Sequence, residues 1–224
     1  MITVHHLENS RSQRVLWLLE ELGAPYEVKR YARDKKTSLA PPELAAVHPL
    51  GKSPVISDGD NVLAETGAIV EYLLDRDGDS RLRPPSGTPE RLRFAYWLHF
   101  AEGSAMPPLV MALVFNKIRT ASMPFFAKPI ARAIADKVTK GFIKPNLERQ
   151  MAFMASELSS RPWFAGTAFS AADIMMSFPL EAASTQRGFQ MQYPALDDFL
   201  LRIHARPAYR RALERGGPYS LEPR

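Results

Sequence analysis

The sequence predicts an α+β N-terminal half followed by an all-helical C-terminal half. Strand-like and helical segments alternate through residues 1–80, whereas helical periodicity alone continues from residue 89. The segment between them is rich in glycine, proline, aspartate and serine, and it has no apolar period, which is typical of a linker. We therefore expect one domain at residues 1–80, a linker at 81–88 and a second domain at 89–224.

The N-terminal half begins with a strand, a polar turn and a helix. Residues 2–7 form a short strand-like run, and apolar residues then recur at helical spacing up to Gly23, a residue type that commonly ends helices. The remaining elements are expected in the order strand at 25–31, short helix at 43–47, strand at 51–56, turn at 58–61, strand at 62–64 and helix at 66–74.

Apolar residues at helical spacing fill the C-terminal half. We expect helices at 92–103, 142–158 and 171–183. Pro124 and Pro129 lie between the first two, and proline bends or breaks a helix because it lacks an N–H donor. A bent or broken connection is therefore expected near these two prolines.

The composition excludes several classes of protein. Hydrophobic residues make up 46% and charged residues 24%, which excludes a disordered or fibrous chain. There is no cysteine, so any sulfur chemistry must use the sulfur of a ligand. His5 and His6 are adjacent in a strand and should point to opposite faces, and the other three histidines are isolated, so no metal site is expected.

The formal net charge is +5, and the basic residues are scattered rather than collected in a long run. We therefore expect no nucleic-acid partner. The N-terminus lacks the pattern of a secretory signal, and no stretch approaches 18 consecutive apolar residues. The expectation is a cytoplasmic protein with no membrane partner.

Four motifs, in a fixed order along the chain, indicate a protein family. They are residues 9–15 after the first strand, residues 48–55, the pair Glu65 and Thr66, and residues 170–174. With these motifs the chain resembles a cytosolic glutathione transferase of the bacterial, serine-type or theta-like kind over essentially its whole length. The resemblance implies a thioredoxin-like N-terminal domain, a helical C-terminal domain, glutathione as co-substrate, no metal and a homodimer.

The resemblance implies that the hydroxyl of Ser10 donates a hydrogen bond to the sulfur of glutathione, because Ser10 stands four residues before Arg14 as in serine-type transferases. A thiol has a pKa near 8.5, and lowering it by about two units requires roughly 2.7 kcal/mol. Ser12, Arg11 and the backbone amides of this turn are the alternatives. Ser10 also has the spacing of a helix-capping box with Gln13, which is a purely structural alternative.

The family pattern also assigns residues that bind glutathione. Thr66 would hold the γ-glutamyl carboxylate and Glu65 the amino group, while Lys52 would face the other carboxylate. Ser53 would offer its backbone to the tripeptide beside a cis-Pro54, since only an X–Pro bond adopts cis at a cost of about 1 kcal/mol or less. Glu102 would reach the amino group of glutathione in the partner subunit. Each charged residue could instead be a plain surface residue.

Two further sets of residues are interpreted from their spacing. Ser170 and Asp173 form a capping box with a folding role only. Apolar residues near a bend at 106–108 could wall a pocket for the electrophile, although this pattern is also typical of core residues. They are Phe100, Met106, Met111 and Phe115.

The leading hypothesis is an enzyme in which the glutathione thiolate attacks a soft, small-molecule electrophile. The same thiolate could reduce peroxides or disulfides, which is the second hypothesis. The third is a non-catalytic relative that binds apolar ligands. The sequence does not distinguish conjugation from reduction.

Overall fold

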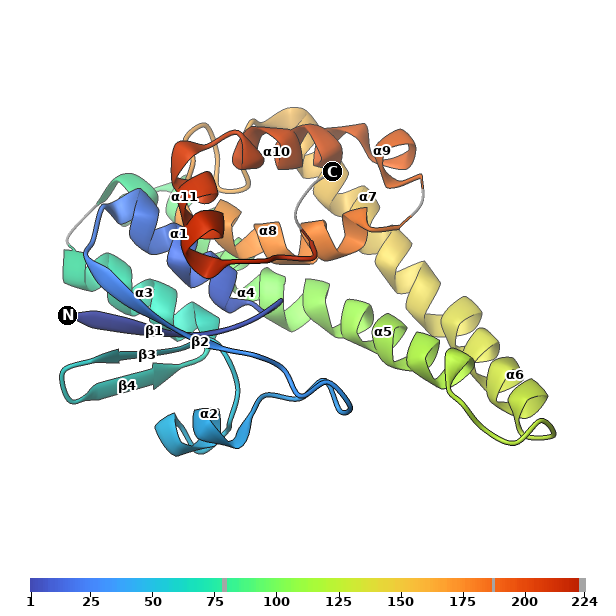
Figure 1. Cartoon of the computed structure of the whole chain (residues 1–224). Coiled ribbons are helices and arrows are strands. Elements are labelled where there is room, and N and C mark those ends of the chain that lie inside the picture. Colours follow the sequence, from blue (N-terminus) through green and yellow to red (C-terminus); the bar gives the residue numbers. More distant parts are fainter. Residues whose placement is uncertain (78–79, 187, 222–224) are drawn as a thin grey trace.

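A four-stranded mixed sheet forms the centre of the N-terminal half (Figure 1). The computed structural model describes residues 1–77, 80–186 and 188–221. The strands lie in the order β2-β1-β3-β4, with β1 parallel to β2 and antiparallel to β3, and β3 antiparallel to β4. Their bounds are β1 Ile2–Leu7, β2 Tyr26–Tyr31, β3 Val55–Asp58 and β4 Asn61–Ala64.

The two faces of the sheet are covered by different helices because side chains alternate along each strand. Ile2 and Val4 of β1 belong to the main core, which also contains residues of α1 (Ser12–Leu22) and α3 (Thr66–Asp77). Leu7 belongs to a small separate cluster with Leu44 of α2 (Pro42–Val47). The β1–α1 turn thus connects Leu7, in the small cluster, to the residues of α1 in the main core.

The expected strand at 51–56 is shifted toward the C-terminus in the structure. β3 begins at Val55, because Pro54 has no N–H to give to a neighbouring strand. The Ser53–Pro54 bond is cis, as the sequence pattern predicts. Residues 51–54 therefore form a loop that approaches the start of α1.

The C-terminal half is built from helices, and the described residues beyond β4 contain no strand. The first of these helices follow a short turn, η1 (Ser80–Leu82). Their bounds are α4 Pro89–Phe100, η2 Ala101–Ala105, α5 Met106–Thr120, α6 Lys128–Val138, η3 Thr139–Ile143, α7 Lys144–Ser160, α8 Ala171–Ser184, α9 Phe189–Gln192, α10 Pro194–His204 and α11 Pro207–Gly216.

A π-helical segment, η2, takes the place of the bend expected at 106–108. It joins α4 and α5 into one continuous helix, Pro89–Thr120. Pro108 gives no N–H to the carbonyl of Ser104, and that carbonyl instead accepts a hydrogen bond from Gln150 Nε2 at 2.9 Å. The wider turn thus accommodates the prolines without breaking the helix.

The helix Pro89–Thr120 is long and apolar enough to cross a membrane, judged by length and composition alone. The expectation that no stretch approaches 18 consecutive apolar residues still holds, because His99 and Glu102 interrupt the apolar residues of this helix. Part of its apolar surface is accounted for by packing, since Phe94, Trp97 and Leu98 of α4 are buried in the core and α4 packs against α8.

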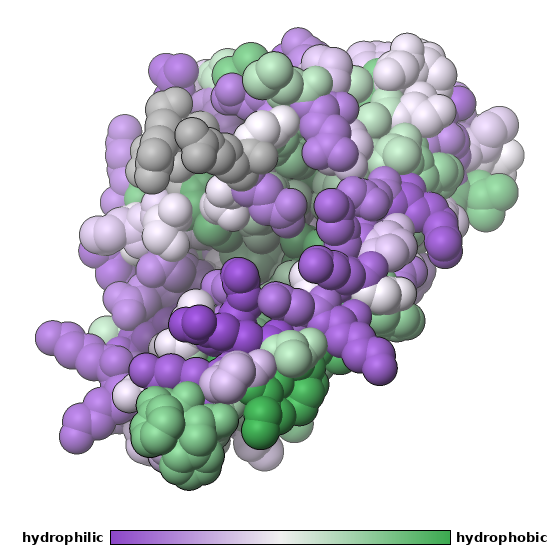
Figure 2. Space-filling model, turned by 90° about the vertical axis from the view of Figure 1, so that its right-hand side faces the viewer, coloured by the Kyte–Doolittle hydropathy of each residue, from purple (hydrophilic) through white to green (hydrophobic). Residues whose placement is uncertain are grey.

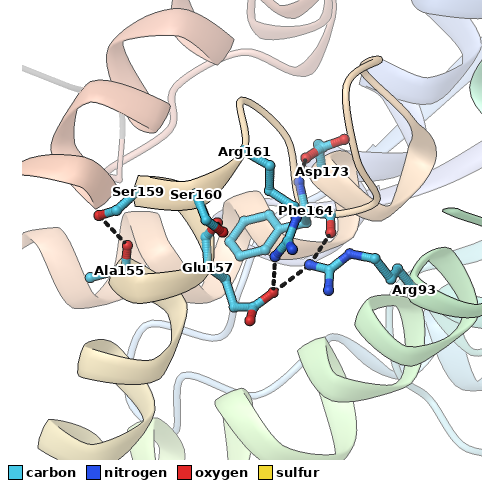
Figure 3. A network of polar contacts seen from close by, with 8 residues as sticks. All are labelled: Arg93, Ala155, Glu157, Ser159, Ser160, Arg161, Phe164 and Asp173. Carbon is cyan, nitrogen blue, oxygen red and sulfur yellow. Dashed lines mark hydrogen bonds and ion pairs between the residues drawn. The ribbon is translucent and has the colours of Figure 1, made fainter. Parts of the chain in front are cut away.

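A polar network fixes the loop between α7 and α8 (Figure 3). Arg93 of α4 donates to the carbonyl of Phe164 at 3.0 Å and pairs with Glu157 of α7, which also pairs with Arg161 at 2.6 Å. Asp173 accepts the N–H of Phe164 at 2.9 Å. The carboxylates of Asp173 on α8 and Glu157 on α7 therefore both stabilise the loop between α7 and α8.

The capping box predicted at Ser170 and Asp173 is present at the start of α8. Asp173 accepts the backbone N–H of Ser170 at 2.8 Å and its hydroxyl at 3.0 Å. Complete burial raises the pKa of Asp173 to about 6, although these hydrogen bonds oppose the shift.

Helix α1 joins the two halves of the molecule. It packs against α3 on one side and against α8 and α11 on the other. Trp17 of α1 meets Tyr209 of α11 edge to face, with ring centroids 5.1 Å apart. The residues at the start of α1 therefore lie where both halves meet.

Candidate active site

The turn from β1 into α1 carries the two serines that the sequence singles out. Ser10 is 5% exposed and Ser12 is fully buried. The hydroxyl of Ser10 accepts the backbone N–H of Ser12 at 3.2 Å. Ser10 is thus the outer and Ser12 the inner member of the pair.

The capping box considered for Ser10 and Gln13 is not formed. α1 has Arg11 at its N-cap, with no side-chain hydrogen bond to the helix. Both polar side-chain atoms of Gln13 are buried without a partner among the described residues. The turn places Ser10 beside Ser12 instead, and Asn9, just before Ser10, adopts a positive φ of 50°.

Hydrogen bonds link these serines to a buried histidine. Ser10 Oγ lies 2.8 Å from Ser12 Oγ, which lies 2.8 Å from His6 Nδ1. Burial, together with the charge of Arg30, lowers the pKa of His6 to about 4. His6 is therefore neutral at pH 7 and has one nitrogen that donates and one that accepts.

His5 and His6 point to opposite faces of β1, as their alternation predicts. His5 contacts the Tyr31 hydroxyl and Ser57 Oγ, each at 2.9 Å, on the face away from Ser12. Among the described residues no group of histidine and acidic side chains could hold a metal ion.

Ser53 joins the other side of the same site. Its hydroxyl donates to the carbonyl of His5 at 3.2 Å and lies 3.3 Å from Ser10 Oγ. The loop before Pro54 and the turn before α1 are therefore in direct contact. Lys52, the next residue toward the N-terminus, is exposed and forms no ion pair within the described part of the chain.

The start of α3 has an unusual backbone. Glu65 is exposed and has a φ of 70°, a left-handed conformation that costs a non-glycine residue of order 1 kcal/mol or more. Its carbonyl accepts the N–H of Ile69 at 3.0 Å, so the helix begins there. The adjoining Thr66 is buried, and the first N–H groups of a helix have no partner within it.

A buried arginine connects α3 to the helical half. Arg14 is 1% exposed; it donates to the carbonyl of Met175 at 2.8 Å and to Thr66 Oγ1 at 3.4 Å, and it pairs with Glu102. Burial lowers the pKa of Arg14 below its ordinary value, while the nearby Glu102 carboxylate opposes the shift. Arg14 remains charged at neutral pH.

Glu102 of η2 is paired within its own chain. One carboxylate oxygen meets Arg14, and the other lies 3.0 Å from Arg11 Nε. The ring of Phe178 lies under both guanidinium groups, at 5.8 Å from Arg11 and 5.4 Å from Arg14. The side chain of Glu102 is 32% exposed, so a further cation can still approach it.

The four apolar residues considered for an electrophile pocket do not share one environment. Phe100 packs in an aromatic cluster with Trp97 and Phe153, with centroids 5.0 and 5.9 Å away, and Met106 is part of the main core. Met111 and Phe115 are partly exposed on α5. Phe178 lies closer to the polar site through its contacts with Arg11 and Arg14.

Sequence reasoning did not assign His6, Arg14 or Phe178 to the site. Arg14 stands among leucines at helical spacing, and this position on an apolar face could have indicated a buried, paired guanidinium. The contacts of Phe178 with Arg11 and Arg14 join residues far apart in the sequence, and the contact of His6 with Ser12 depends on how the turn between them folds. No local pattern predicts them.

A thioredoxin-like sheet with a cis-proline loop, joined to a helical domain, defines the fold class of the cytosolic glutathione transferases. Residues 1–75 match the family of glutathione S-transferase N-terminal domains, and residues 123–207 match the C-terminal domains. The chain belongs to the glutathione S-transferase family.

Individual relatives agree with this assignment. Glutathione S-transferase 1 of Saccharomyces cerevisiae is 34% identical, over 96% of this chain and 95% of its own. A disulfide-bond oxidoreductase of Escherichia coli is 26% identical, over 95% of this chain and 94% of its own. A solved glutathione S-transferase from Actinobacillus pleuropneumoniae is 35% identical and has a TM-score of 0.82, covering 99% of this chain and 95% of that one.

Proposed function

We propose that the protein conjugates glutathione to soft electrophiles, with Ser10 holding the reacting thiolate. The observation that supports this most directly is the chain of hydrogen bonds from His6 through Ser12 to Ser10. Ser10 is its outer end, next to the Ser53 loop where a thioredoxin-like domain would receive a peptide ligand.

The donors and acceptors of this chain can be counted. When His6 carries its proton on Nδ1, it donates to Ser12 Oγ, and the hydroxyl of Ser12 then donates to Ser10 Oγ. Ser10 also accepts the N–H of Ser12. With two hydrogen bonds accepted, Ser10 still has its own hydroxyl proton to donate, either to Ser53 Oγ at 3.3 Å or to the sulfur of a bound glutathione.

The competing donors are less well placed. Ser12 is fully buried, and both its hydroxyl and its N–H are already engaged. Arg11 has its side chain on Glu102, which leaves its backbone N–H as the alternative to Ser10.

This arrangement can supply the free energy needed to lower the pKa of the glutathione thiol. Lowering the thiol pKa by about two units takes about 2.7 kcal/mol. A hydrogen bond to a charged group contributes about 1.5–3 kcal/mol, and the start of a helix adds about 0.3–1 kcal/mol. The thiolate then forms the C–S bond with its lone pair, and the leaving group departs with the electrons of its own bond.

The remaining residues would bind the rest of the tripeptide. Thr66 and the first N–H groups of α3 suit a carboxylate, and the exposed Glu65 suits the amino group. Lys52 would face the other carboxylate. In a homodimer, Glu102 would reach the amino group bound in the partner subunit while keeping Arg11 and Arg14 as partners.

Glutathione binding also agrees with what is known of similar proteins. A sphingomonad glutathione S-transferase that is 26% identical was solved in complex with glutathione. The test is to incubate the protein with glutathione and a chlorinated nitroarene. We expect glutathione-dependent formation of the thioether, and binding of glutathione without turnover of any electrophile or disulfide would favour a non-catalytic role.

Glutathione-dependent disulfide reduction is the second candidate, because the similar E. coli protein is a disulfide-bond oxidoreductase. There the thiolate would attack one sulfur of a disulfide, and the other sulfur would leave as a thiolate; a second glutathione thiolate would then attack the mixed disulfide, giving oxidised glutathione and the second substrate thiolate. Peroxide reduction would use the same thiolate. Either activity yields oxidised glutathione and no thioether, so product analysis separates them from conjugation. A cytosolic location is part of this proposal.

A further inference from the structure

The helices α5 and α6 form a hairpin that extends away from the rest of the molecule (Figure 1). α6 packs against α5 and η3, and Figure 1 shows the outer end of this hairpin far from the sheet. We call residues 117–132, which comprise the end of α5, the connecting segment and the start of α6, the hairpin tip.

The hairpin tip exposes large apolar side chains. Phe125 is 85% exposed and Phe126 is 66% exposed; Ile130 and Ile118 are 62% and 39% exposed. Two adjacent, exposed phenylalanines at the end of a projecting element are uncommon on a soluble surface, where burial of each would be worth about 1.5–3 kcal/mol. Figure 2 looks onto this end of the molecule, where hydrophobic side chains at the bottom of the view lie among hydrophilic ones.

The same hairpin carries the excess positive charge of the chain. Residues 106–144 contain seven lysines and arginines and one aspartate, which leaves 22 basic and 23 acidic residues elsewhere. Within the tip itself there are four basic residues and no acidic one. They are Lys117, Arg119, Lys128 and Arg132.

A different surface suits the proposed contact between two subunits. Leu92 and Tyr96 are exposed on α4, beside Phe153 of α7, close to the body of the molecule. The helix Pro89–Thr120 has 32 residues, and at about 1.5 Å per residue Leu92 lies roughly 40 Å from its far end. A dimer contact confined to Leu92, Tyr96 and Phe153 would leave the hairpin tip uncovered.

We propose that the hairpin tip docks on the surface of an anionic lipid bilayer. Exposed phenylalanine and isoleucine side chains bordered by lysine and arginine are the combination that binds the boundary between headgroups and acyl chains. The charge is complementary to such a membrane, and the aromatic pair is the part that would insert. This is peripheral binding and not the crossing of a bilayer by a helix, and it replaces the sequence-based expectation of no membrane partner.

The test is co-sedimentation of the full-length protein with vesicles of phosphatidylcholine alone or of phosphatidylcholine and phosphatidylserine mixed three to one. We expect the wild-type protein to partition at least tenfold better into the anionic vesicles and to be released when the salt concentration is raised to about 0.5 M. Lys117→Ala with Lys128→Ala should weaken partitioning about 30-fold, at about 1 kcal/mol for each charge. Phe125→Ser with Phe126→Ser should weaken it about 100-fold, at about 1.4 kcal/mol for each partly inserted ring.

The matched control is Met191→Ser, which changes a side chain that is 91% exposed outside the hairpin and should leave partitioning unchanged. Equal partitioning of the wild-type protein into neutral and anionic vesicles would overturn the proposal. So would unchanged partitioning of the double phenylalanine variant. If that variant instead lowers the sedimenting mass of the protein without lipid, the tip is a contact between copies of this chain and the proposal is wrong.

Discussion

Acid destabilisation through His6 is the prediction that the structure specifies most fully. His6 is 2% exposed, and its pKa is lowered from 6.5 to about 4. The unfolded chain therefore binds a proton more tightly than the native state does. The stability that this group contributes is complete above pH 6.5 and is lost as the pH falls from 6.5 toward 4.

The magnitude follows from these two pKa values. Between pH 7 and pH 5 the wild-type protein should lose about 2 kcal/mol of unfolding free energy through His6 alone. The comparison is with His6→Asn, which places an amide near the Nδ1 position beside Ser12 but does not titrate. Any loss of unfolding free energy caused by the smaller asparagine side chain is the same at both pH values, so it cancels when the change between pH 7 and pH 5 is compared.

The assay is urea unfolding at pH 7 and pH 5, followed by the fluorescence of the buried Trp17 and Trp97, at one protein concentration for both chains. The wild-type protein should lose about 2 kcal/mol more than His6→Asn. The reasoning would be refuted if the wild-type protein and His6→Asn lost the same unfolding free energy, within the error of the extrapolation to zero urea. His6 would then not be held in its neutral form.

Three further substitutions test other parts of the structure. Asp173→Ala leaves the N–H groups of Phe164 and Ser170 unpaired and should cost about 2–5 kcal/mol in urea unfolding, whereas Asp198→Ala, on the exposed surface of α10, should cost less than about 1. Arg14→Lys keeps the charge but not the several contacts of the guanidinium, so it should cost about 1–3 kcal/mol and weaken glutathione binding in calorimetry; unchanged binding would remove Arg14 from the site. Glu102→Gln leaves Arg14 without its carboxylate, so a loss of about 1–3 kcal/mol is expected together with weaker glutathione binding, and an unchanged melting curve would contradict the pairing.

Local sequence patterns correctly predict those features of the structure that depend on neighbouring residues. The strand at 2–7, the hairpin around the turn at 58–61 and the capping box of Ser170 and Asp173 each depend on neighbouring residues, and the structure has all three. The opposite directions of His5 and His6 follow from strand alternation alone.

The rest depends on contacts between distant segments. The π-helical segment before Pro107 is stabilised in part by Gln150 of α7, which lies far along the chain, and the partner of Arg14 comes from η2. The spacing of Ser10 and Gln13 fits a helix cap, but the buried His6 and Ser12 offered Ser10 another arrangement. These competing partners lie within six residues of one another, and the cap spacing alone does not decide between the two arrangements.

The role of Ser10 is tested most directly by titrating bound glutathione. The absorbance of the thiolate in the ultraviolet, measured against pH, gives the pKa of the thiol on the protein. Ser10→Ala should raise that pKa by about one to two units, equivalent to about 1.4–2.7 kcal/mol, and lower kcat at pH 7 roughly ten- to a hundredfold with KM for glutathione little changed. Ser12→Ala, which removes only the inner hydroxyl, should give a smaller shift. An unshifted pKa in Ser10→Ala would contradict the account: a shift in Ser12→Ala alone would assign the role to Ser12, and no shift in either variant would leave the backbone N–H of Arg11 as the donor.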